Sequence, residues 1–162
     1  MRIKKRYTLR SDKLREYHAR IDSIIDTSFL KKNKNHKWEC IEFDEDFTII
    51  ALNGDPFLIV DPPLCYPHLR SIHLFTVAAV VVDQGAIPYV CNGADIMYAG
   101  IVQFDMSIHV NDIVVVREEK FQKEIAIGKS FIDARFFDKK KKGKAVMNLH
   151  YVGDKKWGSV IT

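Results

Sequence analysis

Residues 77–104 carry the clearest pattern of apolar and polar positions in the chain. The run 77–82 is apolar and mostly β-branched, which is too short for a helix and suits a strand covered on both faces. Pro88 limits where the next helix begins, because proline is harmless only in the first turn, where N–H groups have no intrahelical partner. The pattern therefore predicts a helix that starts near Gly85 rather than at Asp83.

This predicted helix is short and ends at a glycine. One apolar stripe at helical spacing would pack it on the core, and it is formed by Ile87, Val90 and Cys91. Asn92-Gly93 supplies the left-handed residue that commonly ends a helix. Residues 94–97 then read as a short strand, and Gly100 follows.

Further strands complete the second half of the chain. Residues 112–117 and 123–131 read as strands around a charged turn, and 145–151 read as the closing strand. Between them, Asp133 is placed to cap a short helix that ends at Phe137. In the barrel that the family resemblance described below implies, we expect Trp157 to cover the open end, because its ring is large and amphipathic.

The first half begins with a strand and a helix. Residues 2–10 suit an exposed edge strand, and Ser11 is predicted to cap a helix that runs to about Ser28. The apolar positions of that helix recur at helical spacing and are Leu14, Tyr17, Ile21, Ile24 and Ile25. Residues 31–37 are polar throughout and read as a basic loop.

A predicted meander of strands follows this loop. Strand-like runs cover 38–43, 47–52 and 57–60, and Asn53-Gly54 between the last two is a strong hairpin signal. Residues 61–63 are predicted to break the sheet. After them, Pro67 is expected to open a short helix through Leu74, with the inner positions Leu69, Ile72 and His73.

Together these patterns predict an α+β chain in two parts. We expect residues 1–74 to form an α+β half with an antiparallel sheet, and residues 75–162 to form a second half of strands and short helices. With 162 residues, of which 47% are hydrophobic and 28% charged, the chain is long enough to bury a core. No apolar run reaches the roughly 18 residues of a membrane span, and the first ten residues lack the apolar core of a signal peptide, so we expect a cytoplasmic protein.

Side chains that carry catalysis or bind metal are not arranged in a recognisable pattern. Cys40, Cys65 and Cys91 stand alone, which favours buried small hydrophobic residues over a disulfide framework or a zinc site. The six histidines form no HExxH motif and no pair four residues apart, and the glycines are too widely spaced for a phosphate-binding loop. We therefore expect binding without catalysis, and no metal or cofactor.

The order of motifs in the second half resembles the PUA domain, an RNA-binding module. The family's Gly-Ala pair before an apolar strand matches Gly93-Ala94-Asp95-Ile96-Met97, and its next glycine matches Gly100-Ile101. A polar pair before a β-branched strand matches Asn111-Asp112 and the residues through Val116. The strand that ends in glycine matches Ile125-Ala126-Ile127-Gly128-Lys129. The resemblance spans about residues 77–157 and implies a pre-PUA half followed by a PUA barrel with an RNA-facing groove.

The layout of both halves resembles the malignant T-cell-amplified protein family and its archaeal single-chain relatives. The matching segments are residues 66–70, residues 82–87 and residues 149–157. This resemblance implies a protein that binds ribosomal or transfer RNA and acts in translation initiation, reinitiation or ribosome recycling. In eukaryotes it also implies a density-regulated partner protein.

The candidate RNA-binding residues fall into three groups by role. Gly85 and Ala86 supply backbone N–H groups at the start of the helix. Gly93, Ala94 and Gly100 are small enough to let an RNA backbone approach closely. Lysines placed for phosphates are Lys129, Lys139, Lys140, Lys141, Lys142 and Lys144. The set is completed by Asn92, Met97, Ile101 and Gly128. Each glycine equally suits a structural role as a turn or a cap, and a lysine run equally suits a solvated turn.

Three functions are compatible with these observations. The first is a translation factor that binds small-subunit ribosomal RNA or tRNA. The second is a tRNA-binding accessory subunit for an RNA-modifying enzyme. The third is a protein-interaction module that touches no RNA. A groove of this kind would read structured RNA by shape, phosphates and 2′-hydroxyls.

Overall fold

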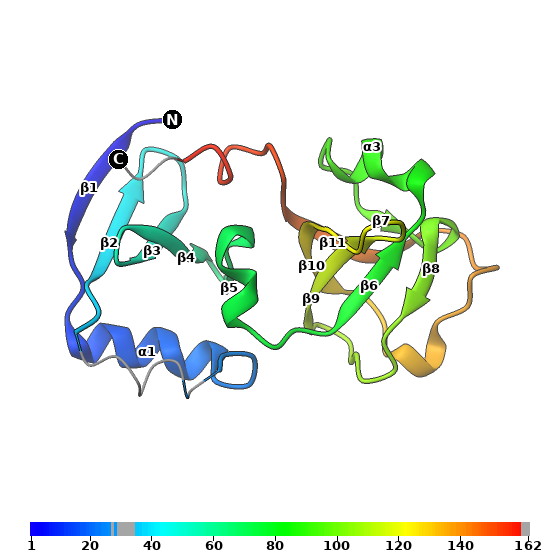
Figure 1. Cartoon of the computed structure of the whole chain (residues 1–162), viewed down its shortest axis with the longest axis horizontal. Coiled ribbons are helices and arrows are strands. Elements are labelled where there is room, and N and C mark those ends of the chain that lie inside the picture. The colour runs from blue at the N-terminus through cyan, green and yellow to red at the C-terminus, as the bar shows by residue number, and fades with distance from the viewer. Residues whose placement is uncertain (27, 29–34, 160–162) are drawn as a thin grey trace. The chain divides into compact units, whose positions relative to one another are not determined.

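The computed structural model describes residues 1–26, 28 and 35–159, and it divides into two compact units (Figure 1). The first unit comprises Met1–Thr76 with Ser159 from the end of the chain, and the second comprises Val77–Gly158. Among the described residues, no helix is long and apolar enough to cross a membrane.

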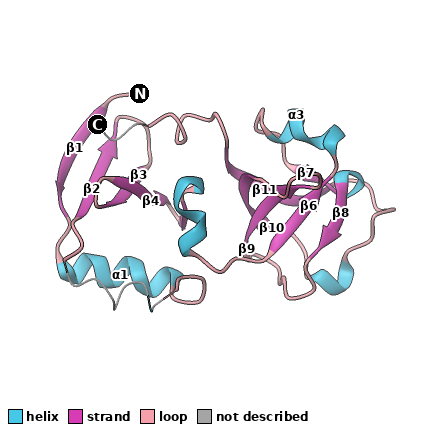
Figure 2. Ribbon diagram, in the orientation of Figure 1, coloured by secondary structure: helices cyan, strands magenta, loops and turns pink. Residues whose placement is uncertain are grey.

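The first unit is built on a five-stranded antiparallel sheet in sequential order (Figure 2). Its strands are β1 Ile3–Thr8, β2 Trp38–Phe43, β3 Thr48–Leu52, β4 Asp55–Asp61 and β5 Leu64–Pro67. The predicted hairpin between β3 and β4 is confirmed, because Asn53 and Gly54 both have positive φ, at 52° and 92°. The edge strand β1 and the three following strands therefore match the sequence pattern, with β4 starting two residues earlier than expected.

Helix α1 covers Ser11–Ile21 and is shorter than the sequence pattern predicts. Ser11 is the first helical residue rather than the cap, and the N-cap Arg10 makes no side-chain capping bond. Beyond Ile21 the backbone pairs with the 74–76 segment: Thr76 N donates to Ile24 O at 2.6 Å. This pairing ends the helix although the apolar spacing continues. Most of the predicted 31–37 loop lies outside the described residues.

Residues 61–74 differ most from the prediction. The sheet does not break at 61–63, because Asp61 pairs with Leu64 and the chain continues as the edge strand β5. Pro67 ends that strand, which suits an edge position where a missing N–H costs no ladder bond. The expected helix is a 3₁₀ turn, η1 Leu69–Leu74. Within it His73 is exposed, and the buried histidine is His68, whose Nδ1 accepts a bond from Arg70 N at 3.1 Å.

The second unit is a nearly closed barrel of six strands in the order β7-β11-β10-β9-β6-β8, which confirms the predicted α+β fold with a C-terminal barrel. The strands are β6 Ala79–Val82, β7 Ile96–Met97, β8 Ile101–Phe104, β9 Ile113–Glu118, β10 Glu124–Ser130 and β11 Lys144–Tyr151. Strand β6 runs parallel to β9, and the other pairs are antiparallel. The buried side chains of β6, β9 and β10 fill the barrel.

Short helical turns connect these strands. They are η2 Gln84–Ala86, α3 Ile87–Val90, η3 Tyr98–Gly100 and η4 Ala134–Phe136. The apolar stripe of α3 packs on the barrel core as predicted, and Gly93 ends the turn with φ 92°. Asp133 precedes η4 but makes no side-chain capping bond, contrary to the prediction. Trp157 is half-buried, and its backbone N–H donates to Asp154 Oδ1 at 2.6 Å.

The three cysteines are unpaired and sit in the two cores or at their margins. Burial raises the pKa of each thiol, to about 11 for Cys65. A thiol with a raised pKa is a poor nucleophile at neutral pH. These residues therefore act as the small hydrophobic side chains that the sequence predicts.

Candidate nucleic-acid interface

A groove of about 350 Å³ lies beside α3 on the barrel. Four predicted site residues come together in its wall, namely Gly85, Ala86, Met97 and Gly100. The remaining lining residues are Asp83, Tyr89, Val90, Asp95, Ile96 and Ala99. The turn η2, helix α3, strand β7 and turn η3 thus form one concave surface from residues 83–100.

Two close contacts shape the inner wall of this groove. Asp83 N donates to Gly100 O at 2.9 Å, which joins the start of η2 to the end of η3. A Cβ on Gly100 would lie 3.1 Å from Ala86 Cβ, so glycine lets the two turns approach closely. Gly100 therefore has a structural role in forming the groove.

Asp83 caps the helical segment, which begins one residue before the predicted start near Gly85. The Asp83 Oδ1 atom accepts a bond from Ala86 N at 2.9 Å, and the turn begins at Gln84. The Ala86 N–H is therefore already bonded within the chain and is not offered to a phosphate. A nearby carboxylate also disfavours a phosphate at this position.

The outer rim of the groove is aromatic and apolar. Tyr89 is 70% exposed, and Met97 is also exposed. Exposed aromatic rings beside a concave apolar wall are suited to stacking on nucleobases. The groove therefore fits the face of a base or a ribose better than it fits a phosphate.

A basic turn lies directly beside this groove. Strand β7 pairs with β11, so that Met97 lies opposite Lys144, and Tyr98 N donates to Gly143 O at 3.1 Å. The Lys144 ammonium forms an ion pair with Asp95 in the groove wall, at 3.0 Å. Four further exposed lysines precede it, Lys139, Lys140, Lys141 and Lys142. Residues 139–144, the lysine turn, are thus continuous with the groove rim.

The β9–β10 turn lies at the same end of the barrel as η2. The Glu118 carboxylate accepts bonds from the backbone N–H groups of Lys120, Phe121 and Lys123 and from the Gln84 side chain. Burial raises the pKa of Glu118, but these hydrogen bonds outweigh it and hold the pKa at about 2. The turn presents Phe121 to solvent, with the ammonium groups of Lys120 and Lys123 at 5.1 and 5.9 Å from the ring centre.

Replacing this carboxylate should change the pH dependence of stability. The folded-state pKa of about 2 lies below the ordinary value of 4.5, so the carboxylate stabilises the fold above pH 4.5 and this contribution disappears as the pH falls towards 2. We expect Glu118→Gln to melt several degrees below the wild type at pH 7, with the difference shrinking at pH 3. Thermal unfolding at both pH values measures this. Glu119→Gln, on an exposed neighbour, is the control, and equal melting of Glu118→Gln and the wild type at pH 7 would contradict the prediction.

Residues 78–152 match the family model described as the PUA domain. An uncharacterised protein of Methanocaldococcus jannaschii is 34% identical over 161 residues, which cover 97% of this chain and 98% of that protein. Translation machinery-associated protein 20 of Schizosaccharomyces pombe is 30% identical over 159 residues, which cover 92% of this chain and 84% of the relative. The chain belongs to the PUA-domain family of translation machinery-associated protein 20.

The family includes the malignant T-cell-amplified proteins, so the resemblance drawn from the sequence is confirmed. Malignant T-cell-amplified sequence 1 of Rattus norvegicus is 32% identical over 120 residues, 70% of this chain and 65% of that protein. A hypothetical protein from Pyrococcus horikoshii has the same fold over both units, with a TM-score of 0.81 and 30% identity over 96% of this chain and 99% of that one.

The other candidate residues of this family member have different positions. Asn92, Gly93 and Ala94 form the exposed turn from α3 to β7, and Ala94 O accepts a bond from Asn148 Nδ2 at 3.0 Å. The side chain of Ile101 is fully buried and lies in the core, not in the groove. Lys129 is half-buried in β10.

Gly128 has a packing role at the contact between β10 and β11. A Cβ there would collide with Val146 Cγ1 and lie 2.7 Å from Met147 O. The register of the two strands shifts between Ile127 and Gly128, which marks a β-bulge. Glycine is therefore needed for the strands to approach at this point.

Six residues of the groove wall were not among the predicted site residues, and three of these have polar or aromatic side chains: Asp83, Tyr89 and Asp95. Tyr89 lies off the apolar stripe of α3, and an aromatic residue on the exposed face of a helix is a usable signal in the sequence. Asp83 directly precedes the helical turn, which is the position of a cap. The role of Asp95 depends on Lys144, which is distant in sequence, so no local pattern indicates it.

Proposed function

We propose that the protein binds structured RNA, either small-subunit ribosomal RNA or tRNA, as a non-catalytic cytoplasmic factor in translation initiation, reinitiation or ribosome recycling. The observation that carries this proposal is the continuity of the lysine turn with the groove rim through Asp95 and Lys144. The role in translation is supported by membership of the family, because a named relative is a translation machinery-associated protein. The same proposal includes a partner protein of the density-regulated type, with which this protein would act.

Two parts of the interface have different tasks in this proposal. The ammonium groups of the lysine turn neutralise phosphates, which gives affinity and salt dependence without sequence selection. The groove receives a base or ribose on the exposed side chains of Tyr89 and Met97. The RNA is therefore held by its backbone on one side and by an unstacked nucleotide on the other.

Crosslinking the protein to RNA in its native cells, followed by sequencing of the attached RNA, tests the proposal. We expect small-subunit ribosomal RNA, with or without initiator tRNA. Enrichment spread over tRNA acceptor stems would indicate RNA modification instead of translation. RNA recovery at background level would contradict the RNA-binding function altogether.

Tyr89→Ala should weaken RNA binding without changing its salt dependence. Loss of one stacking ring costs about 1–3 kcal/mol, which corresponds to a rise in Kd of about fivefold to 150-fold. Because the ring carries no charge, the slope of log K against log salt should stay as in the wild type. Fluorescence anisotropy with a labelled ribosomal RNA helix measures both quantities. Tyr89→Phe keeps the ring and should bind like the wild type, and an equal loss in both variants would argue against stacking.

A further inference from the structure

A second pocket, of about 310 Å³, lies at the other end of the barrel from the groove. Strand β9 separates the two sites: it begins at Ile113, after the 105–112 loop, and ends at Glu118, which bonds to Gln84 of η2. The pocket is lined by Met106, Ile108, His109, Asp133, Ala134 and Arg135. It therefore lies between the 105–112 loop and η4.

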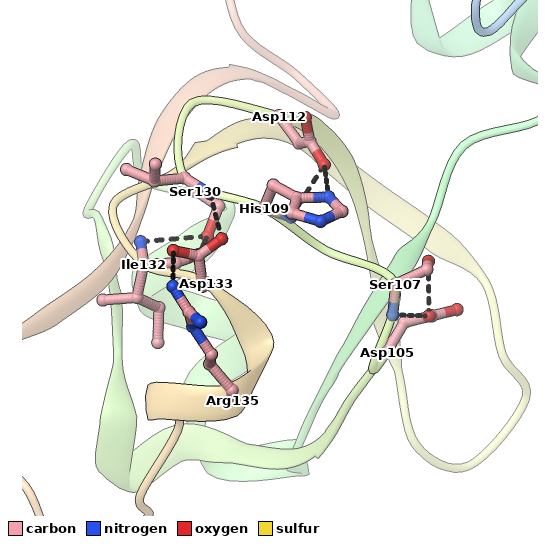
Figure 3. Close-up of polar contacts among 9 residues, drawn as sticks. Asp105, Ser107, His109, Asp112, Ser130, Ile132, Asp133 and Arg135 are labelled. Carbon is pink, nitrogen blue, oxygen red and sulfur yellow. Dashed lines mark hydrogen bonds and ion pairs between the residues drawn. The ribbon is translucent and has the colours of Figure 1, made fainter.

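Hydrogen bonds fix both walls of this pocket (Figure 3). The Asp105 carboxylate accepts bonds from the N–H and the hydroxyl of Ser107, at 2.8 and 2.7 Å. Asp112 Oδ2 accepts a bond from His109 N at 2.8 Å. Ala134 N donates to Ile108 O at 2.8 Å and joins η4 to the loop. The pocket is thus preformed in the folded chain, which lowers the conformational cost of binding.

The Asp133 carboxylate keeps capacity to accept further hydrogen bonds. Its Oδ1 atom accepts from Val110 N at 3.4 Å, and its Oδ2 atom lies 3.9 Å from Arg135 Nη2. Both contacts are long for bonds to a charged group, which are usually about 2.7–2.9 Å. The side chain is 22% exposed, so it lies at the pocket wall within reach of a ligand.

An exposed aromatic ring and a guanidinium group lie beside this carboxylate. Phe136 is 53% exposed, and the Arg135 Cζ atom lies 4.8 Å from the centre of its ring. Aromatic rings and guanidinium planes are the surfaces on which proteins stack unpaired bases. Lys141 Nζ donates to the backbone carbonyl oxygen of Phe136 at 3.4 Å, so the backbone of η4 also contacts the lysine turn.

The local charge favours a polyanion as the occupant. Residues 133–144 contain six basic side chains and two acidic ones. A nucleic-acid backbone complements this charge, and a base attached to it would meet the one carboxylate of the pocket wall. The donors of a base edge, such as N1–H and the 2-amino group of guanine, match the two acceptor oxygens of that carboxylate.

We propose that this pocket binds one unpaired base of the RNA, preferentially guanine, while the neighbouring phosphates contact the lysine turn. Asp133 accepts from the Watson–Crick edge of the base, and Phe136 with Arg135 stacks on the base or on its neighbour. The pocket is separate from the groove beside α3, so the RNA spans the lysine turn between two nucleotide sites. The inference rests on the proposed RNA-binding function.

Binding of three labelled RNA hairpins tests the inference. They are identical except that one has no bulge, one has a bulged guanine and one has a bulged inosine, which lacks the 2-amino group. We expect the wild type to bind the guanine bulge about tenfold tighter than the unbulged hairpin, on the scale of one stacked base, with inosine between them. Asp133→Asn should bind guanine and inosine bulges equally, and Phe136→Leu should lose most of the tenfold gain.

The outcomes separate the inference from the proposed function. Tyr7→Leu removes an exposed ring from the first unit and should bind like the wild type. Should the wild type bind all three hairpins equally, or should both pocket variants keep its preference, the pocket proposal fails while RNA binding stands. Should the wild type bind none of them, with no salt dependence, the proposed function itself fails. Equal melting temperatures of the variants and wild type confirm that each variant is folded.

Discussion

Gly128→Ala is expected to lower the stability of the protein by about 3 kcal/mol, the upper range for overpacking a core, and the melting temperature by roughly 6–12 °C. The added methyl group would meet Val146 Cγ1 and the Met147 carbonyl oxygen. That oxygen belongs to the backbone of β11, whose position is fixed by pairing with both β10 and β7. A backbone atom gives way less easily than the end of a flexible side chain, so the strands must separate.

Gly158→Ala is the matched control for this substitution. The nearest atoms to a Cβ at that position are Asp154 O at 3.6 Å and Lys155 O at 3.8 Å, which are ordinary contacts. Its melting temperature should stay within about 2 °C of the wild type. If Gly128→Ala instead melts like the wild type and loses affinity for RNA, the glycine contacts RNA rather than packing between strands.

The elements that the sequence predicted well depend on local chemistry. Asn53-Gly54 needs positive φ at both residues, and Gly93 needs it at one, whatever the rest of the chain does. The apolar strand 79–82 also depends on its own composition, because a short run rich in β-branched residues favours a buried strand over a helix. Such features can be read from a few neighbouring residues.

The elements that were wrong depend on contacts with distant residues. Strand β5 contains Pro67 and follows two prolines, so its own residues argue against a strand, and only its pairing with β4 forms it. The end of α1 is set by the backbone of residues 74–76, not by the continuing apolar spacing. Sequence patterns do not contain these contacts.

The candidate site could be located but not described from the sequence. Gly85 and Gly100 line the groove and Lys144 adjoins it, but Gly128 packs between β10 and β11. The N–H of Ala86 is bonded to Asp83, and the side chain of Ile101 is buried. An ion pair between Asp95 and Lys144 joins the lysine turn to the groove, and it forms because β7 pairs with β11. A motif fixes the order of residues along the chain, whereas the site depends on which strands become neighbours.

Reversing the charge of Lys139, Lys140, Lys141 and Lys142 to glutamate should lower affinity for structured RNA about a thousandfold at 0.1 M salt. Each lysine that neutralises a phosphate of a duplex releases about 0.9 counterions, so four contacts give a slope of log K against log salt of magnitude near 3 to 4. The glutamates remove these contacts and add repulsion. The remaining slope should therefore fall by about 3 to 4 units.

The matched control makes the same change in net charge on the first unit, by replacing the exposed Arg2, Lys4, Lys5 and Arg15 with glutamate. This variant should keep most of the affinity and of the salt slope, because none of the four replaced residues belongs to the proposed interface and it is direct phosphate contacts that set the slope. Titrations at several salt concentrations between about 0.05 and 0.3 M measure the affinity and the salt slope of both variants. Equal losses in the two variants would mean that net charge alone attracts RNA, and the lysine turn would then lose its place in the interface. A loss confined to the lysine-turn variant would tie RNA affinity to the surface that adjoins the groove.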